Sequence, residues 1–390
     1  MYDGLETNIP DILMAHSDDQ SLLDHKLFPS RQDVLHYLQD YAADIKDNVF
    51  FNTQITDVRY NAKDGQERWI VQSLDLMTRK SDEKAYDAIV VANGHYDVPW
   101  IPKIKGIELW DSQNPGIIAH SKQYLNPEPY EGKKTVIVGY SASGVDIAAQ
   151  ISTKAKLPIL VSQRKPSGLT FPAEYKRDMP EIIEFLPESQ AKRALLFADG
   201  HVETDVDAIL FCTGYLYSFP FLSSLDPPPL STGERVQHLY QHIFLINYPT
   251  LAFVGLPSKI IPFRTFEAQA TIVASIWSGK LDLPSKEAMQ IWEDGTVQQR
   301  GLGKAFHVLE HPRDFDYHDG LLGWASKAAH PKLERLPPQW TDKDRWIRKR
   351  IPQIKGGFAA NGEGRHTITS MESLGFRYEE SAKVDQTTKS

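Results

Sequence analysis

The stretch TVIVGYSASGVDIAAQ (135–150) decides the fold of this 390-residue chain. It begins with a short apolar run that predicts a buried strand, turns at Gly139, and continues with a pattern that predicts a helix. Gly144 allows this helix to lie close to the strand. Because LPILVSQRK (157–165) predicts a second strand, we expect residues 132–165 to form a βαβ unit of a parallel sheet.

The beginning of this helix is a candidate binding site for the pyrophosphate group of a dinucleotide. A helix N-terminus offers backbone N–H groups and the positive end of the helix dipole to an anion. Ser141 stands where the dinucleotide-binding motif has its middle glycine, and its hydroxyl is itself able to bond a phosphate oxygen. We therefore expect a cofactor to be bound by Gly139, Ser141, Ala142, Ser143 and Gly144.

The end of the second strand predicts which dinucleotide is bound. In NAD-binding units an acidic residue about 20 positions further on holds the ribose 2′-hydroxyl. Here that place holds Ser162, Gln163, Arg164 and Lys165, and cations suit a 2′-phosphate. We therefore expect Ser162 and Arg164 to contact NADPH. The alternative is that Arg164 is a solvated cation at the end of the strand.

The composition of the chain excludes several other classes of protein. A net charge of −8 makes nucleic acid and anionic membranes poor candidates for the main partner. No apolar run approaches the roughly 18–20 residues of a membrane-spanning helix, and the N-terminus lacks the pattern of a signal peptide. The single cysteine, Cys212, excludes an internal disulfide and a redox-active cysteine pair, and we expect it to be a packed core residue. We expect a cytoplasmic protein.

The segment SRQDVLHYLQDYAADI (30–45) predicts a helix that starts with a capping box of Ser30 and Asp33. Its predicted apolar face consists of Val34, Leu35, Leu38, Tyr41 and Ala42. Residues 48–60 and 68–76 contain two further apolar, β-branched runs, which predict a β-meander.

Four segments of the second half carry weaker patterns. TFEAQATIVASIWSG (265–279) predicts a helix, and the chain after residue 355 is rich in Gly, Ser and Thr, which predicts a disordered tail. HPRDFDYHDG (311–320) contains several acids and histidines, but such loops are mostly solvated, and we expect no metal site. RWIRKR (345–350) predicts a solvated helix face.

Two further apolar strands end in turns of a related kind, DAIVVANGHY (87–96) and DAILFCTGY (207–215). TNIP (7–10), PGIIAHSKQY (115–124) and LAFVGLP (251–257) accompany them along the chain. Taken in this order, the segments resemble the flavin-containing monooxygenase family, in particular its fungal N,N-dimethylaniline monooxygenase-like members.

The resemblance includes the pattern by which this family is identified, F-x-G-x-x-x-H-x-x-x-Y. The chain matches it at Gly116, His120 and Tyr124, whereas Asn114 stands at the first aromatic position. The family's A-T-G-Y strand end is similar to CTGY (212–215).

This resemblance implies an α/β fold with two dinucleotide-binding, Rossmann-like domains, the NADPH domain being inserted into the FAD domain. The predicted parts are a first part of the FAD domain (1–125), the NADPH domain (126–212), a second part of the FAD domain with C-terminal helices (213–335) and a polar, partly disordered extension (336–390). The family's opening βαβ unit, with the FAD pyrophosphate loop, lies before TNIP and is missing here. We interpret the sequence as an incomplete gene model, the alternative being a chain that has lost tight FAD binding. In either case we expect poor binding of FAD.

The resemblance also implies an activity. In the family NADPH reduces FAD, and the reduced flavin takes up O₂ to form a C4a-hydroperoxyflavin, whose distal oxygen is attacked by a soft nucleophile, an amine nitrogen or a sulfide sulfur. The expected partners are therefore a small nucleophilic substrate and O₂, with a homodimer left open. Two alternatives remain, a Baeyer–Villiger-type ketone monooxygenase and a non-catalytic NADP-binding remnant.

Two asparagines are candidates for the flavin side of such a site. Asn8 of TNIP matches the family asparagine beside the flavin and the retained nicotinamide, and is the expected catalytic residue. Asn93 follows a buried strand and is expected to line the domain interface. For both residues the alternative is a turn, which asparagine favours in any case.

Five further residues are expected near the cofactors on the same grounds. His120 is expected to organise the crossover between the domains. Thr213 and Gly214 would let the chain pass close to the cofactors, Gly214 because it lacks Cβ. Glu267 and Gln269 are expected to open the helix whose N-terminus, in the family, points toward the flavin ring.

Overall fold

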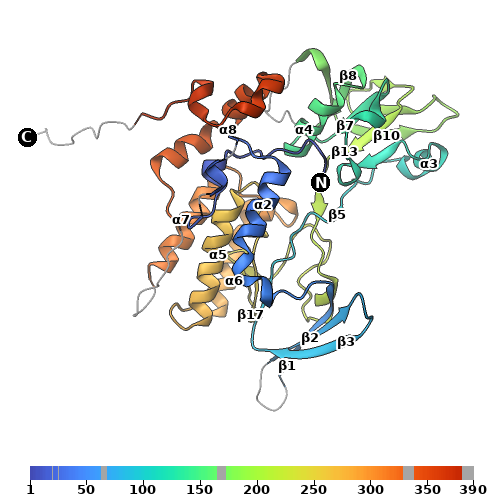
Figure 1. Cartoon of the computed structure of the whole chain (residues 1–390). Helices are drawn as coiled ribbons and strands as arrows, with labels where there is room; N and C mark the ends of the chain where they lie inside the picture. Colours follow the sequence, from blue (N-terminus) through green and yellow to red (C-terminus); the bar gives the residue numbers. More distant parts are fainter. Residues whose placement is uncertain (20, 25, 63–67, 165–172, 328–337, 380–390) are drawn as a thin grey trace, which may run out of the picture. The chain divides into compact units, whose positions relative to one another are not determined.

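The computed structural model describes the whole chain except residues 20, 25, 63–67, 165–172, 328–337 and 380–390 (Figure 1). Its residues divide into two compact units. Unit 1 consists of Met1–Glu6 and Gly94–Ser218, and unit 2 of Thr7–Asn93 and Phe219–Ser390. Both units contain helices and sheets, so the predicted α/β class is confirmed. Among the described residues, no helix is both long and apolar enough to span a membrane.

Unit 1 is built on a five-stranded sheet in which every pair of neighbours is parallel. The strands, in spatial order, are β6 (Ile118–His120), β13 (Ala208–Phe211), β7 (Lys134–Val138), β8 (Lys156–Ser162) and β9 (Lys176–Met179). Helix α4 (Ala142–Ile151) connects β7 to β8. The predicted βαβ unit is therefore confirmed.

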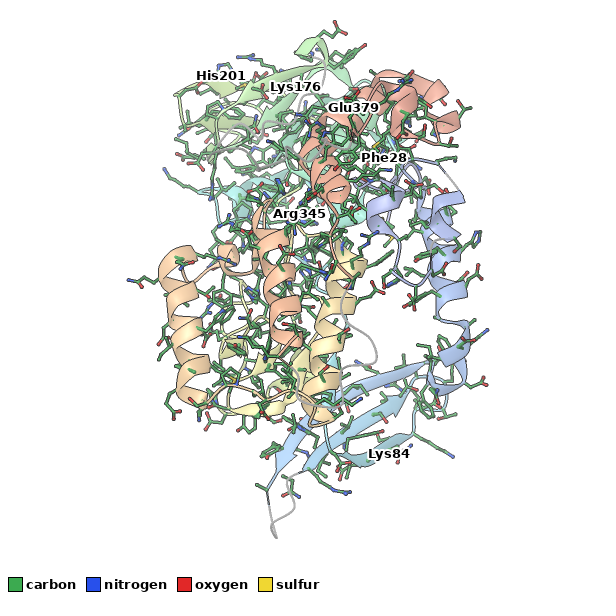
Figure 2. The ribbon with its side chains drawn as sticks, turned by 90° about the vertical axis from the view of Figure 1, so that its left-hand side faces the viewer. Phe28, Lys84, Lys176, His201, Arg345 and Glu379 are labelled. Carbon is green, nitrogen blue, oxygen red and sulfur yellow. The ribbon has the colours of Figure 1, made fainter. Side chains whose placement is uncertain are left out.

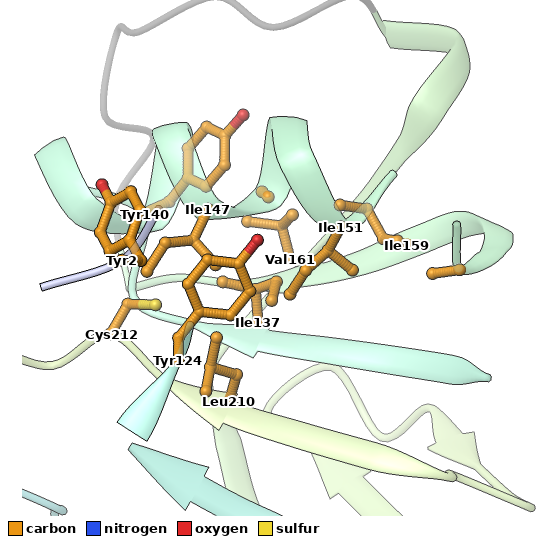
Figure 3. Close-up of a cluster of buried hydrophobic side chains, with 12 residues drawn as sticks. Tyr2, Tyr124, Ile137, Tyr140, Ile147, Ile151, Ile159, Val161, Leu210 and Cys212 are labelled. Atoms are coloured by element: carbon orange, nitrogen blue, oxygen red, sulfur yellow. The ribbon is translucent and has the colours of Figure 1, made fainter. Parts of the chain in front are cut away.

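The strands β7 and β13 in the middle of this sheet are buried on both faces, as continuous apolar runs require. Ile137 and Val161 face the side of helix α4 and pack with Ile147 (Figure 3). The intervening residues, such as Val136, join a second cluster with Trp110 on the opposite face. This alternation follows from the two-residue period of a β-strand.

Smaller elements complete unit 1. They are two antiparallel sheets, a helix and three 3₁₀ turns: β10 (Ile182–Leu186), β11 (Ala194–Phe197), β12 (Val202–Glu203); β5 (Val98–Pro99), β14 (Tyr215–Leu216); α3 (Ile107–Gln113); η4 (Ser121–Gln123), η5 (Glu128–Tyr130), η6 (Ala173–Tyr175).

In the described part of unit 2 there are two sheets. The predicted meander is confirmed as an antiparallel sheet of β1 (Thr53–Asn61), β2 (Arg68–Asp75) and β3 (Ser81–Tyr86). The second sheet has the order β15 (Leu239–Tyr240), β16 (Phe244–Leu245), β17 (Tyr248–Phe253), β4 (Ile89–Val91), and its β17–β4 pair is parallel.

The remaining elements of unit 2 are helical. They are α1 (Asp11–Met14), η1 (Ser21–Asp24), α2 (Arg31–Tyr41), η2 (Ala43–Asn48), η7 (Pro220–Leu222), α5 (Pro262–Trp277), α6 (Lys286–Arg300), η8 (Lys304–His307), α7 (Arg313–Ala325), α8 (Asp342–Ala360), η9 (Gly362–Thr367) and η10 (Met371–Leu374).

Helix α2 confirms one prediction and corrects another. The capping box of Ser30 and Asp33 is present. The predicted apolar face is wrong in part: Val34 packs against the buried cluster of Tyr37, whereas Leu35 is 51% exposed and Leu38 is 37% exposed. The buried residue of the helix is Tyr37, whose hydroxyl accepts from the His16 N–H and donates to a backbone carbonyl. The side of α2 that turns inward is thus the side of Tyr37, whose buried hydroxyl has its hydrogen-bond partners there.

The expected disorder after residue 355 is wrong for residues 355–374, which include the end of α8 and two 3₁₀ turns. Ile347, Ile354 and Phe358 lie on one face of α8 and are buried with Phe28. This apolar stripe is not evident from the composition of α8, because charged and polar residues stand between its members. Residues 380–390 lie outside the described part of the chain.

The interpretation of RWIRKR (345–350) as a solvated face is also wrong in part. Arg345 pairs with Asp319 at 2.7 Å and Arg348 with Asp314 at 2.6 Å, which connects α8 to α7. Figure 2 labels Arg345 on its helix.

Candidate functional site

Two positions where β7 turns into α4 have room for glycine only. Gly139 has a φ of +90°, and a Cβ built on it would lie 2.9 Å from the carbonyl oxygen of Cys212. A Cβ on Gly144 would lie 2.2 Å from the carbonyl oxygen of Gly139. Both contacts are closer than real side chains tolerate, so the two glycines allow α4 to begin directly against the strand ends.

The first turn of α4 is open to a ligand. Ser141, Ala142 and Ser143 are exposed, and the first turn contains no acidic residue. Within the described chain, the side chain of the N-cap residue Ser141 makes no capping hydrogen bond. The first backbone N–H groups of any helix have no partner inside that helix. These N–H groups and the Ser141 hydroxyl form a donor set that fits a phosphate group.

Ser162 lies beside this turn, but its hydroxyl serves the fold. Its backbone oxygen accepts from the Gly139 N–H at 2.9 Å, which brings the strand end to the glycine turn. The hydroxyl is buried and donates to the Pro180 carbonyl at 2.9 Å. Ser162 therefore contributes to a dinucleotide site through its backbone, which holds the strand end beside the glycine turn.

Arg164 lies two residues after Ser162 and extends into solvent. Its side chain is 73% exposed and its Nε lies 3.0 Å from a carboxylate oxygen of Glu181. An exposed ion pair of this kind is weak, so the guanidinium remains able to bind an anion. The neighbouring Lys165 lies outside the described residues.

The predicted residues at the end of β13 are connected to one another. The Thr213 hydroxyl donates to the Trp100 carbonyl. The Gly214 carbonyl accepts from the Trp100 N–H at 2.9 Å and contacts His120 Nε2 at 3.0 Å. Because His120 Nδ1 accepts from the Lys122 N–H, the Nε2 atom carries the proton and donates to Gly214. His120 is buried and holds this strand end in place.

Cys212 lies between the end of β13 and Thr213, and it is a core residue, as predicted. It is buried in the cluster drawn in Figure 3. Burial raises the pKa of its thiol to about 12, so the reactive thiolate is not formed at neutral pH.

The two candidate asparagines lie in unit 2, and both are exposed. The backbone around Asn8 is held firmly, since the preceding Thr7 donates its N–H to Pro29 and accepts from Lys355 Nζ at 2.8 Å. The side chain of Asn8 therefore projects from a fixed piece of chain. Asn93 follows β4.

Glu267 is a half-buried carboxylate with a set of donors around it. The Ser17 hydroxyl donates to it at 3.0 Å, and His16 Nδ1 lies 3.7 Å away. Burial by itself raises the pKa of Glu267, but the nearby His16 and the hydrogen bonds from Ser17 outweigh it and the pKa is lowered. Glu267 is therefore ionised at neutral pH and holds the loop that contains Ser17.

Gln269 lies wholly inside unit 2. Its Oε1 accepts from the Gly255 N–H at 2.9 Å, and its Nε2 donates to the Tyr317 hydroxyl at 2.9 Å. The prediction that Glu267 and Gln269 open their helix is wrong, because α5 already begins at Pro262. Proline favours the first turn of a helix, so Pro262 is the signal in the sequence for this earlier start.

One cluster in unit 2 was not found from the sequence. The His16 ring is stacked between Tyr41, with ring centroids 3.9 Å apart, and Phe263, at 4.8 Å. No sequence pattern could have shown it, because the rings come from three separate segments. Within the described residues, no group of three or more His, Cys, Asp or Glu side chains is arranged to hold a metal ion.

Comparison with known proteins connects this geometry to a family. The model of the flavin-binding monooxygenase-like family matches residues 1–172 and 179–319. The flavin-containing monooxygenase FMO GS-OX-like 4 of Arabidopsis thaliana is 33% identical over 377 residues, which cover 88% of this chain and 81% of the relative.

Two solved structures are similar to this chain. The S-allyl-L-cysteine S-oxygenase of Allium sativum is 27% identical, has a TM-score of 0.77, and covers 96% of this chain and 82% of its own. Tmm from a Pelagibacter species is 22% identical with a TM-score of 0.70 over 92% of this chain and 76% of its own, and this likeness supports the fold alone.

Proposed function

Because the chain belongs to the flavin-binding monooxygenase-like family, whose members use FAD and NADPH, we propose that it transfers one oxygen atom from O₂ to a soft nucleophile. The proposed acceptor is a sulfide sulfur or an amine nitrogen. Sulfur is favoured, because the Allium sativum relative is an oxygenase of a sulfide, S-allyl-L-cysteine.

The open first turn of α4 is the observation that carries the proposal. Its exposed N–H groups, the Ser141 hydroxyl and the absence of acids in that turn fit the diphosphate of NADPH. Arg164, two residues beyond the end of β8, would bind the 2′-phosphate. We propose that unit 1 holds this nucleotide in a domain inserted into the FAD domain.

The flavin supplies the oxygen-transfer chemistry when it is bound, and the nicotinamide supplies the hydride. The residues of the chain bind and orient the cofactors and the substrate. Asn8 offers an exposed amide on a backbone that Thr7 and Lys355 hold in place, and we assign to it the orientation of the reacting groups. Gln269 holds the loop at Gly255 rather than touching a ligand, since both of its polar atoms are already bonded.

Oxygenation is tested with the purified chain, FAD in excess, NADPH and methyl phenyl sulfide. We expect sulfoxide formation that depends on NADPH, and a loss of at least about a hundredfold in Asn8→Ala, by analogy with the removal of one positioned hydrogen-bonding group from an active site. NADPH affinity should be unchanged in this variant, which separates catalysis from binding.

Two results would contradict the proposal. One is sulfoxide formation by Asn8→Ala at the rate of the wild type, which would remove the role of this residue. The other is a wild-type chain that binds neither NADPH nor FAD at millimolar concentration, which would leave a non-catalytic protein. Exclusive conversion of a cyclic ketone to a lactone would instead support the Baeyer–Villiger alternative.

A further inference from the structure

The first residues of the chain are a packed part of unit 1. Met1–Glu6 belong to this unit, and Tyr2 is only 8% exposed. The Tyr2 ring lies edge-on to that of Tyr124, with centroids 5.4 Å apart, and shares a buried cluster with Ile147 of α4 (Figure 3). This segment therefore packs against the helix that begins at the glycine turn.

The hydroxyl of Tyr2 donates a hydrogen bond to the carboxylate of Asp146 on α4. Burial is the main reason why the pKa of Tyr2 lies far above its ordinary value, and the charge of Asp146 raises it further. The hydroxyl thus keeps its proton at every physiological pH and remains a donor. Gln150 Nε2 donates to the same carboxylate oxygen at 3.3 Å, and to the Gly4 carbonyl at 3.4 Å.

Asp146 occupies a sensitive place on the helix. It is the fifth residue of α4 and follows Ala142 by four positions, so it lies on the same face and about 6 Å further along the axis. Side chains of a helix incline toward its N-terminus, which is the end that offers N–H groups to a phosphate. A bare carboxylate at this distance repels a diphosphate, because the separation is within a Debye length.

We propose that Tyr2 is a positioning residue for the dinucleotide site, which fixes the Asp146 carboxylate against the N-terminal segment and offsets its charge. The inference rests on the proposed function, because it assumes a diphosphate at α4. Tyr2 acts through Asp146, so its removal should affect NADP⁺ and NAD⁺ alike. In this respect it differs from Arg164, which we expect to discriminate between them.

The test uses Tyr2→Phe, which keeps the ring and removes only the hydroxyl. Binding of NADP⁺ and NAD⁺ to the full chain is measured by calorimetry at low salt and at about 0.5 M salt, where the Debye length is only a few ångströms. We expect about threefold weaker binding of both nucleotides at low salt, because the Asp146 carboxylate then repels the diphosphate without the hydroxyl that offsets its charge. At high salt the difference should vanish.

Asp146→Asn provides the matched background, because it removes the charge itself. The double variant Tyr2→Phe, Asp146→Asn should bind as tightly as Asp146→Asn alone. A merely structural role of the tyrosine would weaken binding equally in both backgrounds and at both salt concentrations, and would overturn the inference. Equal affinities of the wild type and Tyr2→Phe would overturn it too. A wild-type chain that binds neither nucleotide would overturn the proposed function, and the inference with it.

Discussion

Helix α4 of unit 1 and helix α5 of unit 2 both carry residues that the sequence predicts to bind cofactors, but their polar groups are used differently. The first turn of α4 is exposed, and the Ser141 side chain makes no capping bond within the described chain. In α5, Gln269 is buried with both polar atoms bonded, and Glu267 accepts from Ser17. The first helix thus leaves donors for a ligand, whereas the second uses its polar groups to hold neighbouring segments.

The difference follows from the length of the side chains. The residues that begin α4 are Ser, Ala, Ser and Gly, which are too short to reach the backbone of another element. Glu and Gln are long enough to satisfy buried N–H and O–H groups, and a buried polar group that lacks a partner is costly.

The largest effect is expected for Gly144→Ala. Its Cβ would lie 2.2 Å from the Gly139 carbonyl oxygen, so α4 must move away from the turn. We expect a loss of roughly 3 kcal/mol in the free energy of unfolding, as in other overpacked sites, and no measurable NADPH binding. Urea unfolding and calorimetry measure the two effects.

Gly295→Ala is the control for this change, because a Cβ there meets no atom within 4 Å. It lies within helix α6, so alanine should leave stability equal or slightly raised. A Gly144→Ala chain as stable as Gly295→Ala would show that the turn is less tightly packed than the structure indicates.

The buried carboxyl of Asp11 should make unit 2 sensitive to pH. Burial raises its pKa to about 7 from an ordinary value of 3.8, although a hydrogen bond from the Ile12 N–H lowers it. Between these values the folded state binds more protons than the unfolded state, so stability falls as the pH rises toward 7. Urea unfolding at pH 5 and pH 8 should show that the wild type loses roughly 2 kcal/mol more than Asp11→Asn. Parallel pH profiles of the two proteins would contradict this.

Gln269→Leu tests whether α5 holds the fold rather than a ligand. It leaves the Gly255 N–H and the Tyr317 hydroxyl without their bonds to Gln269. We expect roughly 2 kcal/mol of destabilisation in urea unfolding and an unchanged affinity for NADPH. A large loss of FAD affinity with unchanged stability would restore Gln269 as a direct cofactor ligand.

Arg164→Ala tests the choice of dinucleotide. The guanidinium is exposed, so stability should not change, while NADPH should bind on the order of tenfold more weakly and NADH equally well. Lys192→Ala, which removes another exposed cation of unit 1, should leave both affinities unchanged. If Arg164→Ala weakens both nucleotides to the same extent, the 2′-phosphate assignment is wrong.

Ser141→Ala is expected to have the smallest effect. The hydroxyl makes no capping bond, so unfolding should be unaltered, and NADPH binding should weaken about threefold through the loss of one neutral hydrogen bond. A clear drop in stability without loss of binding would place Ser141 with the polar groups of α5 and remove the contrast between the two helices.

The local patterns of the sequence were sufficient for the elements but not for their faces. The capping box at Ser30 and the βαβ unit around Gly139 depend on neighbours in the chain, and both are present. Which side of α2 faces inward depends on its contacts with His16 in the 15–19 loop. Tyr37 makes these contacts, and Leu35 is exposed. Likewise, the apolar stripe of α8 is buried because the fold places it beside Phe28, which is distant along the chain.

The candidate site also contains residues that local patterns identify and contacts that depend on distant parts of the chain. Gly139 and Gly144 could be assigned from the sequence, because only a glycine permits such a turn and such a close helix. Ser162, which the sequence also favours, has its hydroxyl bonded to Pro180, 18 residues away. The bond between Tyr2 and Asp146 spans 144 residues and has no trace in any local pattern.

The amino-acid sequence by itself determined the parallel sheet, the glycine turn and the membership of a monooxygenase family, since these rest on residue types at fixed short spacings. Only the tertiary structure decided which polar side chains are left for a ligand. The physical reason is that a donor or acceptor bonds to whatever the fold places within about 3 Å of it, and those partners are distant along the chain.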